Sequence, residues 1–344
     1  MTHRRLAIAA AIVLSGLLGA CGSNGNEMSI EGGAVPESTA SDSDQSETLS
    51  ASDHNAADTD ANTGATRDDS DTQPEGDTSV PSSIISLSPT ATEMLYAIGA
   101  GSAVVAVDDF SNYPAETSDK MPGISGYDPN VEAILGIGAD LIVTDGTNPD
   151  LIDALERAGV SHWEGYAAVT IEDAFDQIEQ LGELTGHEAE AAEVVSSLEA
   201  RLAALLDRID ALSVLDEPLT YYHELDNTYY SVTSETFIGT TYSLLGLRNI
   251  ADLAEGDSYG YPQLSAEFIL DKDPDLIFLA CTIYCGETPE SVAARPGWDV
   301  LTAVAEGHVF SLDDDTASRW GPRILDHMTS VVDAVELVVA AKAG

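Results

Sequence analysis

The chain has 344 residues, 44% of them hydrophobic, and carries 60 acidic against 13 basic side chains, a formal net charge of −47. This charge excludes the basic face with which a DNA- or RNA-binding protein meets the phosphate backbone. It equally disfavours attachment to anionic lipid through basic residues, so we expect no nucleic-acid partner and no peripheral membrane contact of that kind.

The first 21 residues have the pattern of an export signal. Two arginines precede an unbroken run of apolar and small residues from 6 to 20. These 15 residues are too few to span a bilayer about 30 Å thick, but a basic start and a short apolar stretch are typical of a secretory signal. The run ends in Leu-Gly-Ala before Cys21, which resembles the bacterial lipobox. We therefore interpret 1–21 as a lipoprotein signal peptide with Cys21 lipidated; the alternative is an ordinary signal with a coincidental cysteine.

Residues 22–80 have the composition of a disordered acidic linker. They contain 14 acidic residues, with Arg67 as the only basic one. Such a segment cannot bury enough apolar surface to offset its chain entropy, and its self-repulsion keeps it extended. We expect an exported protein anchored to the outer face of the cytoplasmic membrane, at the cell surface or in the periplasm, only through the lipid on Cys21.

Strand and helix signals alternate from residue 84 onward. Strands are predicted near 84–88, 104–107 and 141–143, with helices near 92–98, 150–158 and 170–184. A second series has strands near 219–222, 276–279 and 309–312, and helices near 236–245, 266–270 and 324–341. This β-α-β-α order predicts parallel sheets covered by helices.

One long helix is predicted between the two series, over 187–212. The segment contains neither Gly nor Pro, and its apolar residues recur every three or four positions: Val194, Leu198, Leu202, Leu205 and Ile209. At 1.5 Å per residue this helix is roughly 35 Å long. The folded part therefore divides into an N-terminal lobe (81–186), a connecting helix (187–212) and a C-terminal lobe (213–344).

An internal repeat indicates that the two lobes are similar. Residues 130–142 align without a gap with 265–277, at a constant offset of 135. Six positions are identical in the two copies: Glu132/Glu267, Ile134/Ile269, Leu135/Leu270, Asp140/Asp275, Leu141/Leu276 and Ile142/Ile277. The predicted fold class is thus α/β, with two similar lobes of mostly parallel sheet joined by one long rigid helix. A cleft between such lobes is the natural binding site.

Glu132 and Glu267 fall at the second position of their predicted helices. An acid there interacts favourably with the helix dipole by about 0.3–1 kcal/mol, which by itself explains both residues. The alternative is that two equivalent exposed acids face a symmetric basic partner.

Cys281 and Cys285 are the cysteines that remain in the exported part. An even pair in an oxidising compartment favours a disulfide closing a small loop. Two cysteines without a nearby histidine or further cysteines are weak evidence for zinc, so no bound metal is expected.

Several stretches resemble one family, the iron-siderophore and vitamin B12 periplasmic binding proteins. The resemblance covers roughly residues 82–341 and rests on four motifs in order: Ile85-Ser-Leu-Ser-Pro-Thr-Ala-Thr-Glu-Met-Leu-Tyr-Ala-Ile-Gly99, Val105-Ala-Val-Asp-Asp-Phe-Ser-Asn-Tyr-Pro114, Gly126-Tyr-Asp-Pro-Asn-Val-Glu132 and Ser318-Arg-Trp-Gly-Pro-Arg-Ile324. It implies two α/β lobes bridged by a long helix. It also implies capture of a metal chelate and its delivery to an ABC importer, by a monomer without enzymatic activity or cofactor.

The resemblance also implies a role for the repeated acids. In this family a glutamate on each lobe pairs with arginines of the two permease subunits, and Glu132 and Glu267 fall at those positions. We therefore favour docking to an ABC permease dimer over the helix-dipole explanation, with several charges acting together because exposed pairs are individually weak.

Candidate ligand residues lie where strands end, because ligands of open α/β sheets bind beyond the carboxyl ends of the strands. On the N-terminal lobe these are Ser88, Pro89, Thr90, Asp108, Asp109, Phe110, Tyr127, Asp145 and Gly146. On the C-terminal lobe they are His223, Cys281, Tyr284, Arg319 and Trp320. The resemblance places Phe110 at an aromatic position that lines B12 and Arg319 at a ligand-side arginine. A single aromatic residue here is as well explained by packing, and His223 by a structural histidine.

The ligand class follows from charge. A trianionic catecholate complex requires several cations, whereas the candidate residues offer chiefly Arg319, with Asp108 and Asp109 opposing it. A corrinoid or a hydroxamate-type siderophore carries little negative charge and fits better, and haem, with a Tyr or His ligand as in relatives, is the alternative chelate.

Two other classes of protein remain as alternatives. A chelate-processing enzyme is disfavoured because the sequence contains no dinucleotide-binding loop, no phosphate-binding loop and no G-x-S-x-G elbow. An adhesive or structural surface lipoprotein is compatible with the long linker, but the repeat of the two lobes does not support it.

Overall fold

The computed structural model describes residues 80–212, 217–256 and 258–343. The predicted signal peptide, Cys21 and all of the predicted linker except Val80 lie outside the described residues. No helix in the described part is both long and apolar enough to cross a membrane.

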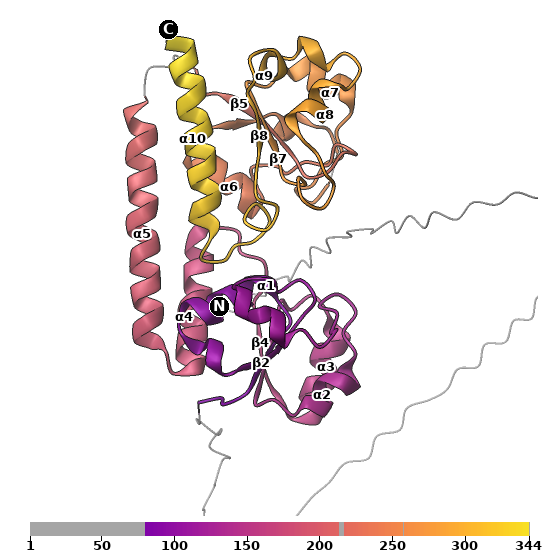
Figure 1. Cartoon of the computed structure of the whole chain (residues 1–344), viewed down its shortest axis with the longest axis vertical. Coiled ribbons are helices and arrows are strands. Elements are labelled where there is room, and N and C mark those ends of the chain that lie inside the picture. The colour runs from indigo at the N-terminus through magenta and orange to yellow at the C-terminus, as the bar shows by residue number, and fades with distance from the viewer. Residues whose placement is uncertain (1–79, 213–216, 257, 344) are drawn as a thin grey trace, which may run out of the picture. The chain divides into compact units, whose positions relative to one another are not determined.

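The N-terminal lobe is built on a parallel sheet of four strands in the order β2-β1-β3-β4 (Figure 1). Its strands are β1 (Ile84–Ser86), β2 (Val104–Val107), β3 (Leu141–Thr144) and β4 (Ser161–Glu164). Its helices are α1 (Pro89–Ala97), α2 (Val131–Ile137), α3 (Pro149–Ala158) and α4 (Ile171–Thr185), with short 3-10 turns at Ala100–Ser102 and Ala115–Lys120. Every residue of β1 and β3 is buried, as expected for central strands of a parallel sheet covered on both faces.

The C-terminal lobe repeats this arrangement in the order β6-β5-β7-β8. Its strands are β5 (Thr220–Glu224), β6 (Arg248–Asn249), β7 (Leu276–Leu279) and β8 (Val309–Ser311). Its helices are α6 (Phe237–Leu244), α7 (Ala266–Lys272), α8 (Pro289–Ala293), α9 (Thr302–Ala305) and α10 (Ile324–Ala343), with 3-10 turns at Ile250–Leu253 and Trp298–Val300. The predicted fold of two similar parallel-sheet lobes is therefore confirmed.

The repeated aspartates have the same structural role in both lobes. Asp140 accepts hydrogen bonds from the backbone N–H groups of Ser82 at 2.8 Å and Ser83 at 3.0 Å. Asp275 accepts one from the N–H of Thr220 at 2.8 Å. Each carboxylate thus fixes the start of the central strand beside its own strand, which explains why the repeat retains this residue.

The connecting helix is α5 (Glu188–Ala211), within one residue of the prediction at each end. It packs against α4 and against α10, which lies beside it (Figure 1). Arg208 of α5 pairs with Asp333 and Glu336 of α10, and Arg201 pairs with Asp326.

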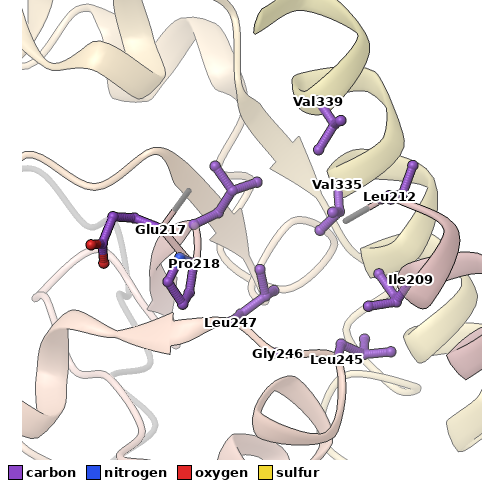
Figure 2. A pocket seen from close by; sticks show the side chains of 10 residues that line it. Ile209, Leu212, Glu217, Pro218, Leu245, Gly246, Leu247, Val335 and Val339 are labelled. Carbon is purple, nitrogen blue, oxygen red and sulfur yellow. The ribbon is translucent and has the colours of Figure 1, made fainter. Parts of the chain in front are cut away.

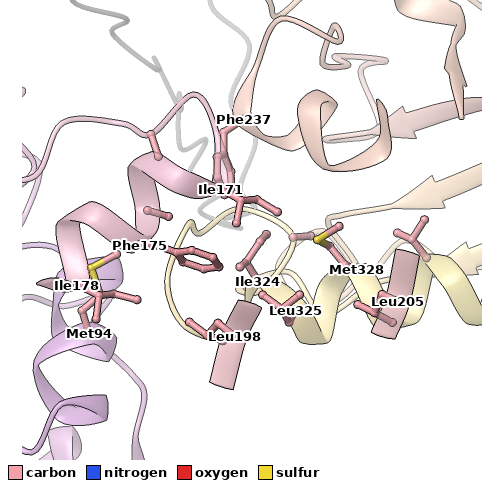
Figure 3. Packing of buried hydrophobic residues seen from close by; sticks show 14 of the residues in the cluster. Met94, Ile171, Phe175, Ile178, Leu198, Leu205, Phe237, Ile324, Leu325 and Met328 are labelled. Atoms are coloured by element: carbon pink, nitrogen blue, oxygen red, sulfur yellow. The ribbon is translucent and has the colours of Figure 1, made fainter. Parts of the chain in front are cut away.

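One apolar core extends across both lobes. It includes residues of both sheets together with α1, α4, α5, α6 and α10. Figure 3 shows part of it, which extends from Met94 at one side through Phe175 and Leu198 to Leu325 and Met328. A smaller separate core lies within each lobe. Because the shared core would be disrupted by a large rotation of one lobe against the other, it favours small relative movement.

Candidate functional site

Exposed aromatic side chains gather on the segments that follow the strands. Phe110 and Tyr113 follow β2, Tyr166 follows β4, Tyr230 follows β5 and Tyr284 follows β7, and all five are at least 40% exposed. Strands within each sheet are parallel, so these residues lie at the carboxyl edge of their sheets. Such an edge is where open α/β sheets bind ligands.

Tyr127 and Tyr259 lie on segments that contact the segments following β2 and β5. Gly126, before Tyr127, is close enough to Asp108 that an added Cβ would lie 2.5 Å from its carboxylate. Gly260, after Tyr259, accepts a hydrogen bond from the N–H of Thr233 in the segment after β5. Tyr127 is 77% exposed and Tyr259 73%. We define these seven exposed aromatic residues as the aromatic rim: Phe110, Tyr113, Tyr127, Tyr166, Tyr230, Tyr259 and Tyr284.

The carboxyl-edge segments of the two lobes bond directly to each other through Arg319. Its guanidinium donates to Glu93 at 2.9 Å, to Asn112 at 3.0 Å and to the carbonyl of Phe110 at 3.1 Å, all on the N-terminal lobe. It also donates to Asp315 at 2.7 Å. Only 10% of the Arg319 side chain is exposed. The structure therefore places the predicted ligand-side arginine in a contact between the lobes, with its charge already paired.

Arg323 is paired in the same network. It binds both carboxylate oxygens of Glu93, at 2.6 and 2.9 Å, and its guanidinium lies 4.0 Å from the ring centre of Tyr113. Glu93 itself is buried. We call Glu93, Arg319 and Arg323 the inter-lobe ion cluster. Sequence reasoning missed Glu93 because it falls in the middle of a helix that reads as apolar.

Asp108 and Asp109, adjacent in sequence, have different environments. Asp108 is buried, and its Oδ1 accepts from the N–H of Ser111 at 2.7 Å and of Phe110 at 3.1 Å. Burial raises the pKa of Asp108 above its usual value, opposed by these hydrogen bonds. Its carboxylate shapes the turn that displays Phe110, whereas Asp109 is exposed.

The residues at the start of α1 have mainly a structural role. Ser88 is the N-cap, and its hydroxyl accepts from the N–H of Ala91 at 3.3 Å. Pro89 occupies the first turn, so the helix begins three residues earlier than the predicted start at 92. Ser88 and Thr90 are buried and Pro89 is half-buried, so this segment forms the floor of the edge and offers little surface to a ligand.

Gly146 forms a close contact with Tyr166. Its φ is +71°, and an added Cβ would lie 2.6 Å from the ring of Tyr166. Asp145 accepts from the N–H of Thr147 at 2.9 Å and is half-buried. Tyr166 also donates to Glu164. Tyr166 was missed because β4 was not predicted, although the run His-Trp-Glu-Gly-Tyr at 162–166 carried the aromatic signal.

His223 and Trp320 have their polar groups turned to other protein residues. His223 is fully buried in β5, its Nδ1 lies 2.9 Å from the hydroxyl of Tyr242, and burial lowers its pKa to about 3. It therefore has no surface for a ligand in this structure. Trp320 donates through Nε1 to Gln177 of the N-terminal lobe at 3.0 Å.

The predicted cysteine pair is joined by a disulfide, with Cα atoms 5.1 Å apart. It closes the loop after β7, from which Tyr284 projects with 64% exposure. Among the described residues, no group of three or more His, Cys, Asp or Glu side chains is arranged to hold a metal ion.

Two shallow pockets lie away from all of these residues. One of about 350 Å³ is on α10, lined by Asp333, Glu336, Leu337 and Ala340. The other, of about 210 Å³, lies where α5, α10 and the segments flanking β5 and β6 meet (Figure 2). Its lining is mostly aliphatic and has no aromatic residue: Ile209, Leu212, Glu217, Pro218, Leu219, Leu245, Gly246, Leu247, Val335 and Val339.

Glu132 and Glu267 occupy matching exposed positions in the first turns of α2 and α7. The N-cap lies two residues before the glutamate in each case: Asn130 accepts from the N–H of Ala133, and Ser265 accepts from the N–H of Phe268. None of the ion pairs found in the described part involves either glutamate, so both charges are available to a partner.

Comparison with known proteins identifies the family. A family model described as periplasmic binding protein matches residues 84–316. This chain belongs to the periplasmic binding protein family. The expected resemblance is thereby confirmed. Members bind substrates and do not turn them over, so this family member is a substrate-binding protein of the ABC-import type and not an enzyme.

Individual relatives agree with this assignment. A cobalamin-binding protein of Halobacterium salinarum is 30% identical over 262 residues, covering 74% of this chain and 70% of that protein. An uncharacterised ABC transporter substrate-binding lipoprotein of Bacillus subtilis is 27% identical over 261 residues, covering 74% of this chain and 80% of that protein.

Solved structures show the same architecture. The periplasmic vitamin B12 binding protein of Vibrio cholerae superposes with a TM-score of 0.63 at 27% identity, covering 75% of this chain and 98% of that one. A periplasmic heme-binding protein of Roseiflexus superposes with a TM-score of 0.66 at 21% identity, over 75% of this chain and 98% of that one, which is a likeness of fold alone.

Proposed function

We propose that this protein captures a corrinoid of the cobalamin type at the aromatic rim and delivers it to an ABC importer. The observation that carries the proposal is a binding edge rich in exposed aromatic rings whose nearby arginines are already paired with protein carboxylates. A large, weakly charged chelate gains from contact with apolar rings and requires no free cation. Two of the relatives are named as cobalamin- or vitamin B12-binding proteins, which supports the same choice.

Charge separates this ligand from catecholate siderophores. Arg319 and Arg323 both bind Glu93, so three charges in the inter-lobe ion cluster sum to one positive charge, and Asp315 cancels it. A trianionic complex at this edge would meet no net positive charge from the cluster and would be repelled by the exposed Asp109. Ferric hydroxamates share the low charge of corrinoids and are the second ligand class to test.

Calorimetric titration of the full-length protein in detergent tests the ligand. We expect saturable, sub-micromolar binding of cyanocobalamin and none of a ferric catecholate. Binding of a ferric hydroxamate in place of cyanocobalamin would keep the transport function and change the ligand. A folded protein that binds neither of these nor haem would contradict the proposal.

We also propose that Cys21 carries the lipid anchor and that Glu132 and Glu267 dock to the two permease subunits. The docking proposal is supported by the matching, exposed and unpaired positions of the two glutamates on repeat-related helices. The lipid is checked by the mass of the N-terminal peptide released from purified protein.

Charge reversal at both glutamates tests docking. Glu132→Arg with Glu267→Arg should leave cyanocobalamin affinity unchanged and reduce transport at least tenfold in vesicles holding the importer, because the variant's arginines would meet permease arginines. The matched control is Asp150→Arg with Glu290→Arg, which reverses exposed acids in the first turns of α3 and α8. Equal transport by the test and control proteins would refute the docking role.

A further inference from the structure

The loop from Cys281 to Cys285 displays two large apolar side chains at the carboxyl edge of β7. Ile283 is 67% exposed and Tyr284 64% exposed, although neighbouring Thr282 is half-buried. The disulfide joins the two ends of this five-residue segment. We call it the 281–285 loop.

A buried carboxylate holds the 281–285 loop from inside. Asp314 accepts hydrogen bonds from the N–H of Thr282 at 2.7 Å, and from those of Ile283 and Tyr284 at 3.0 Å each. It also accepts from the hydroxyl of Thr282 at 2.8 Å. Asp314 is only 4% exposed, so these bonds are shielded from water. Three successive loop amides are therefore fixed by one side chain.

The 281–285 loop adjoins the contact between the lobes. Asp315, next to Asp314, accepts from Asn112 of the N-terminal lobe at 2.8 Å and from Arg319 at 2.7 Å. The hydroxyl of Tyr284 donates at 3.4 Å to Oδ1 of Asp315, the same oxygen that accepts from Arg319. Ile283 and Tyr284 thus lie on the same side of the molecule as Phe110, whose carbonyl also binds Arg319.

We propose that the 281–285 loop is a contact surface for the ligand that its disulfide and Asp314 hold in one conformation before binding. This inference rests on the proposed function. Exposed apolar side chains on a flexible loop would lose conformational freedom on binding, and a loop fixed beforehand avoids that loss. The disulfide restricts the chain ends and Asp314 restricts the amides, so removing either constraint restores the entropy cost.

Affinity measurements test the contact. The double variant Cys281→Ser with Cys285→Ser removes the disulfide and should bind cyanocobalamin about tenfold more weakly than the wild type. Ile283→Ser and Tyr284→Ala should each weaken binding by a similar factor, because they remove the apolar contact itself. The full-length protein in detergent serves for all titrations.

The matched control is Val300→Ser. Val300 is 73% exposed on the same lobe, two residues before Thr302, whose N–H donates to Asp273 at the amino end of β7. It therefore lies at the opposite edge of the sheet and should leave affinity unchanged. Wild-type affinity in all the loop variants would overturn the inference while leaving the proposed function intact.

A measurement without ligand tests preorganisation separately. In hydrogen exchange of the wild-type protein, the amides of Ile283 and Tyr284 should exchange at least tenfold more slowly than in the double serine variant. Equal exchange rates would overturn preorganisation whatever the ligand is. If the wild type binds none of cyanocobalamin, ferric hydroxamate or haem, the proposed function fails and the ligand role of the loop fails with it. If it binds one of the latter two, the same variants are titrated with that chelate.

Discussion

Two buried histidines, His223 and His327, make the stability of the protein depend on pH. His223 and His327 both lie edge-on to Tyr242, with ring centres 5.6 and 5.5 Å from it. Burial lowers the pKa of His327 to about 4, and neither of its ring nitrogens has a hydrogen-bond partner among the described residues. Both histidines are therefore neutral in the folded protein at neutral pH.

This arrangement predicts loss of stability at acid pH. Below the ordinary histidine pKa of 6.5 His327 is protonated in the unfolded chain, whereas in the folded chain it stays neutral down to about pH 4. The free energy of unfolding therefore falls as the pH falls from 6.5 to about 4. Replacing His327→Leu should make the loss between pH 8 and pH 5 smaller by about 2 kcal/mol. Urea unfolding of both proteins at the two pH values measures this difference. Both proteins contain the same carboxylates, so subtracting one pH dependence from the other removes their contribution. A parallel pH dependence in wild type and variant would contradict it.

Glu93 is the residue on which the inter-lobe ion cluster depends. Its side chain is 2% exposed and pairs with two arginines, Arg319 and Arg323. Removing one partner of a buried ion group leaves uncompensated charge, so Glu93→Gln should lower the free energy of unfolding by about 3 kcal/mol. The comparison is Glu132→Gln, an exposed and unpaired site, where a change below about 0.5 kcal/mol is expected. Similar midpoints in urea for both variants would show that the cluster contributes little.

At the level of elements, the start of α4 combines a helix cap with a contact between the lobes. Thr170 accepts from the N–H of Asp173 at 3.1 Å, and Asp173 accepts in return from the N–H of Thr170 at 2.9 Å. Just before this capping box, the carbonyl of Val169 accepts from Thr240 of the C-terminal lobe at 2.8 Å. The cap therefore fixes both a helix end and a contact between lobes.

Removing the cap should cost stability in a graded way. Thr170→Ala leaves the N–H of Asp173 without its acceptor and should lower the free energy of unfolding by about 1 kcal/mol. Thr170→Ser keeps the hydroxyl and should lower the free energy of unfolding by at most about 0.3 kcal/mol. Urea midpoints of the three proteins measure the series, and equal losses for Ala and Ser would assign the effect to the lost methyl group and not to the cap.

At the scale of the whole molecule, charge repulsion opposes folding. Residues 81–344 include 46 acidic and 10 basic residues. The two arginines of the inter-lobe ion cluster are already paired with carboxylates. Many of the acids are exposed on helix surfaces, as along α4 and α5. Compacting so many like charges raises the energy of the folded state.

Salt should therefore stabilise this protein strongly. Between 0.1 and 2 M KCl the thermal midpoint should rise, because the screening length falls from about 10 Å to below about 3 Å. A variant with five exposed glutamates of α4 and α5 changed to glutamine should start higher and respond less: Glu172, Glu179, Glu183, Glu190 and Glu193. If wild type and variant gain equally, the salt effect comes from apolar burial and not from screening.

The repeat shows how far sequence reasoning extends. The identical residues at 130–142 and 265–277 predicted two similar lobes, and each copy folds as a capped helix followed by a buried central strand. Local patterns suffice there because capping, helical spacing and a continuous apolar strand are properties of neighbouring residues. The edge strand β4 was not predicted, because its run Ser-His-Trp-Glu is only partly buried and lacks the apolar character of a central strand.

Patterns among neighbouring residues were enough to predict the two-lobe α/β fold, the single connecting helix and the family, all of which are confirmed. The partners of Arg319 could not be predicted in this way, because Glu93 and Asn112 are more than 200 positions away in the chain. The same holds for His223, whose exposure depends on Tyr242 and α10 packing over it. A local pattern reports the conformation of neighbouring residues, whereas the charge and burial of a site are set by residues that meet only when the two lobes pack together.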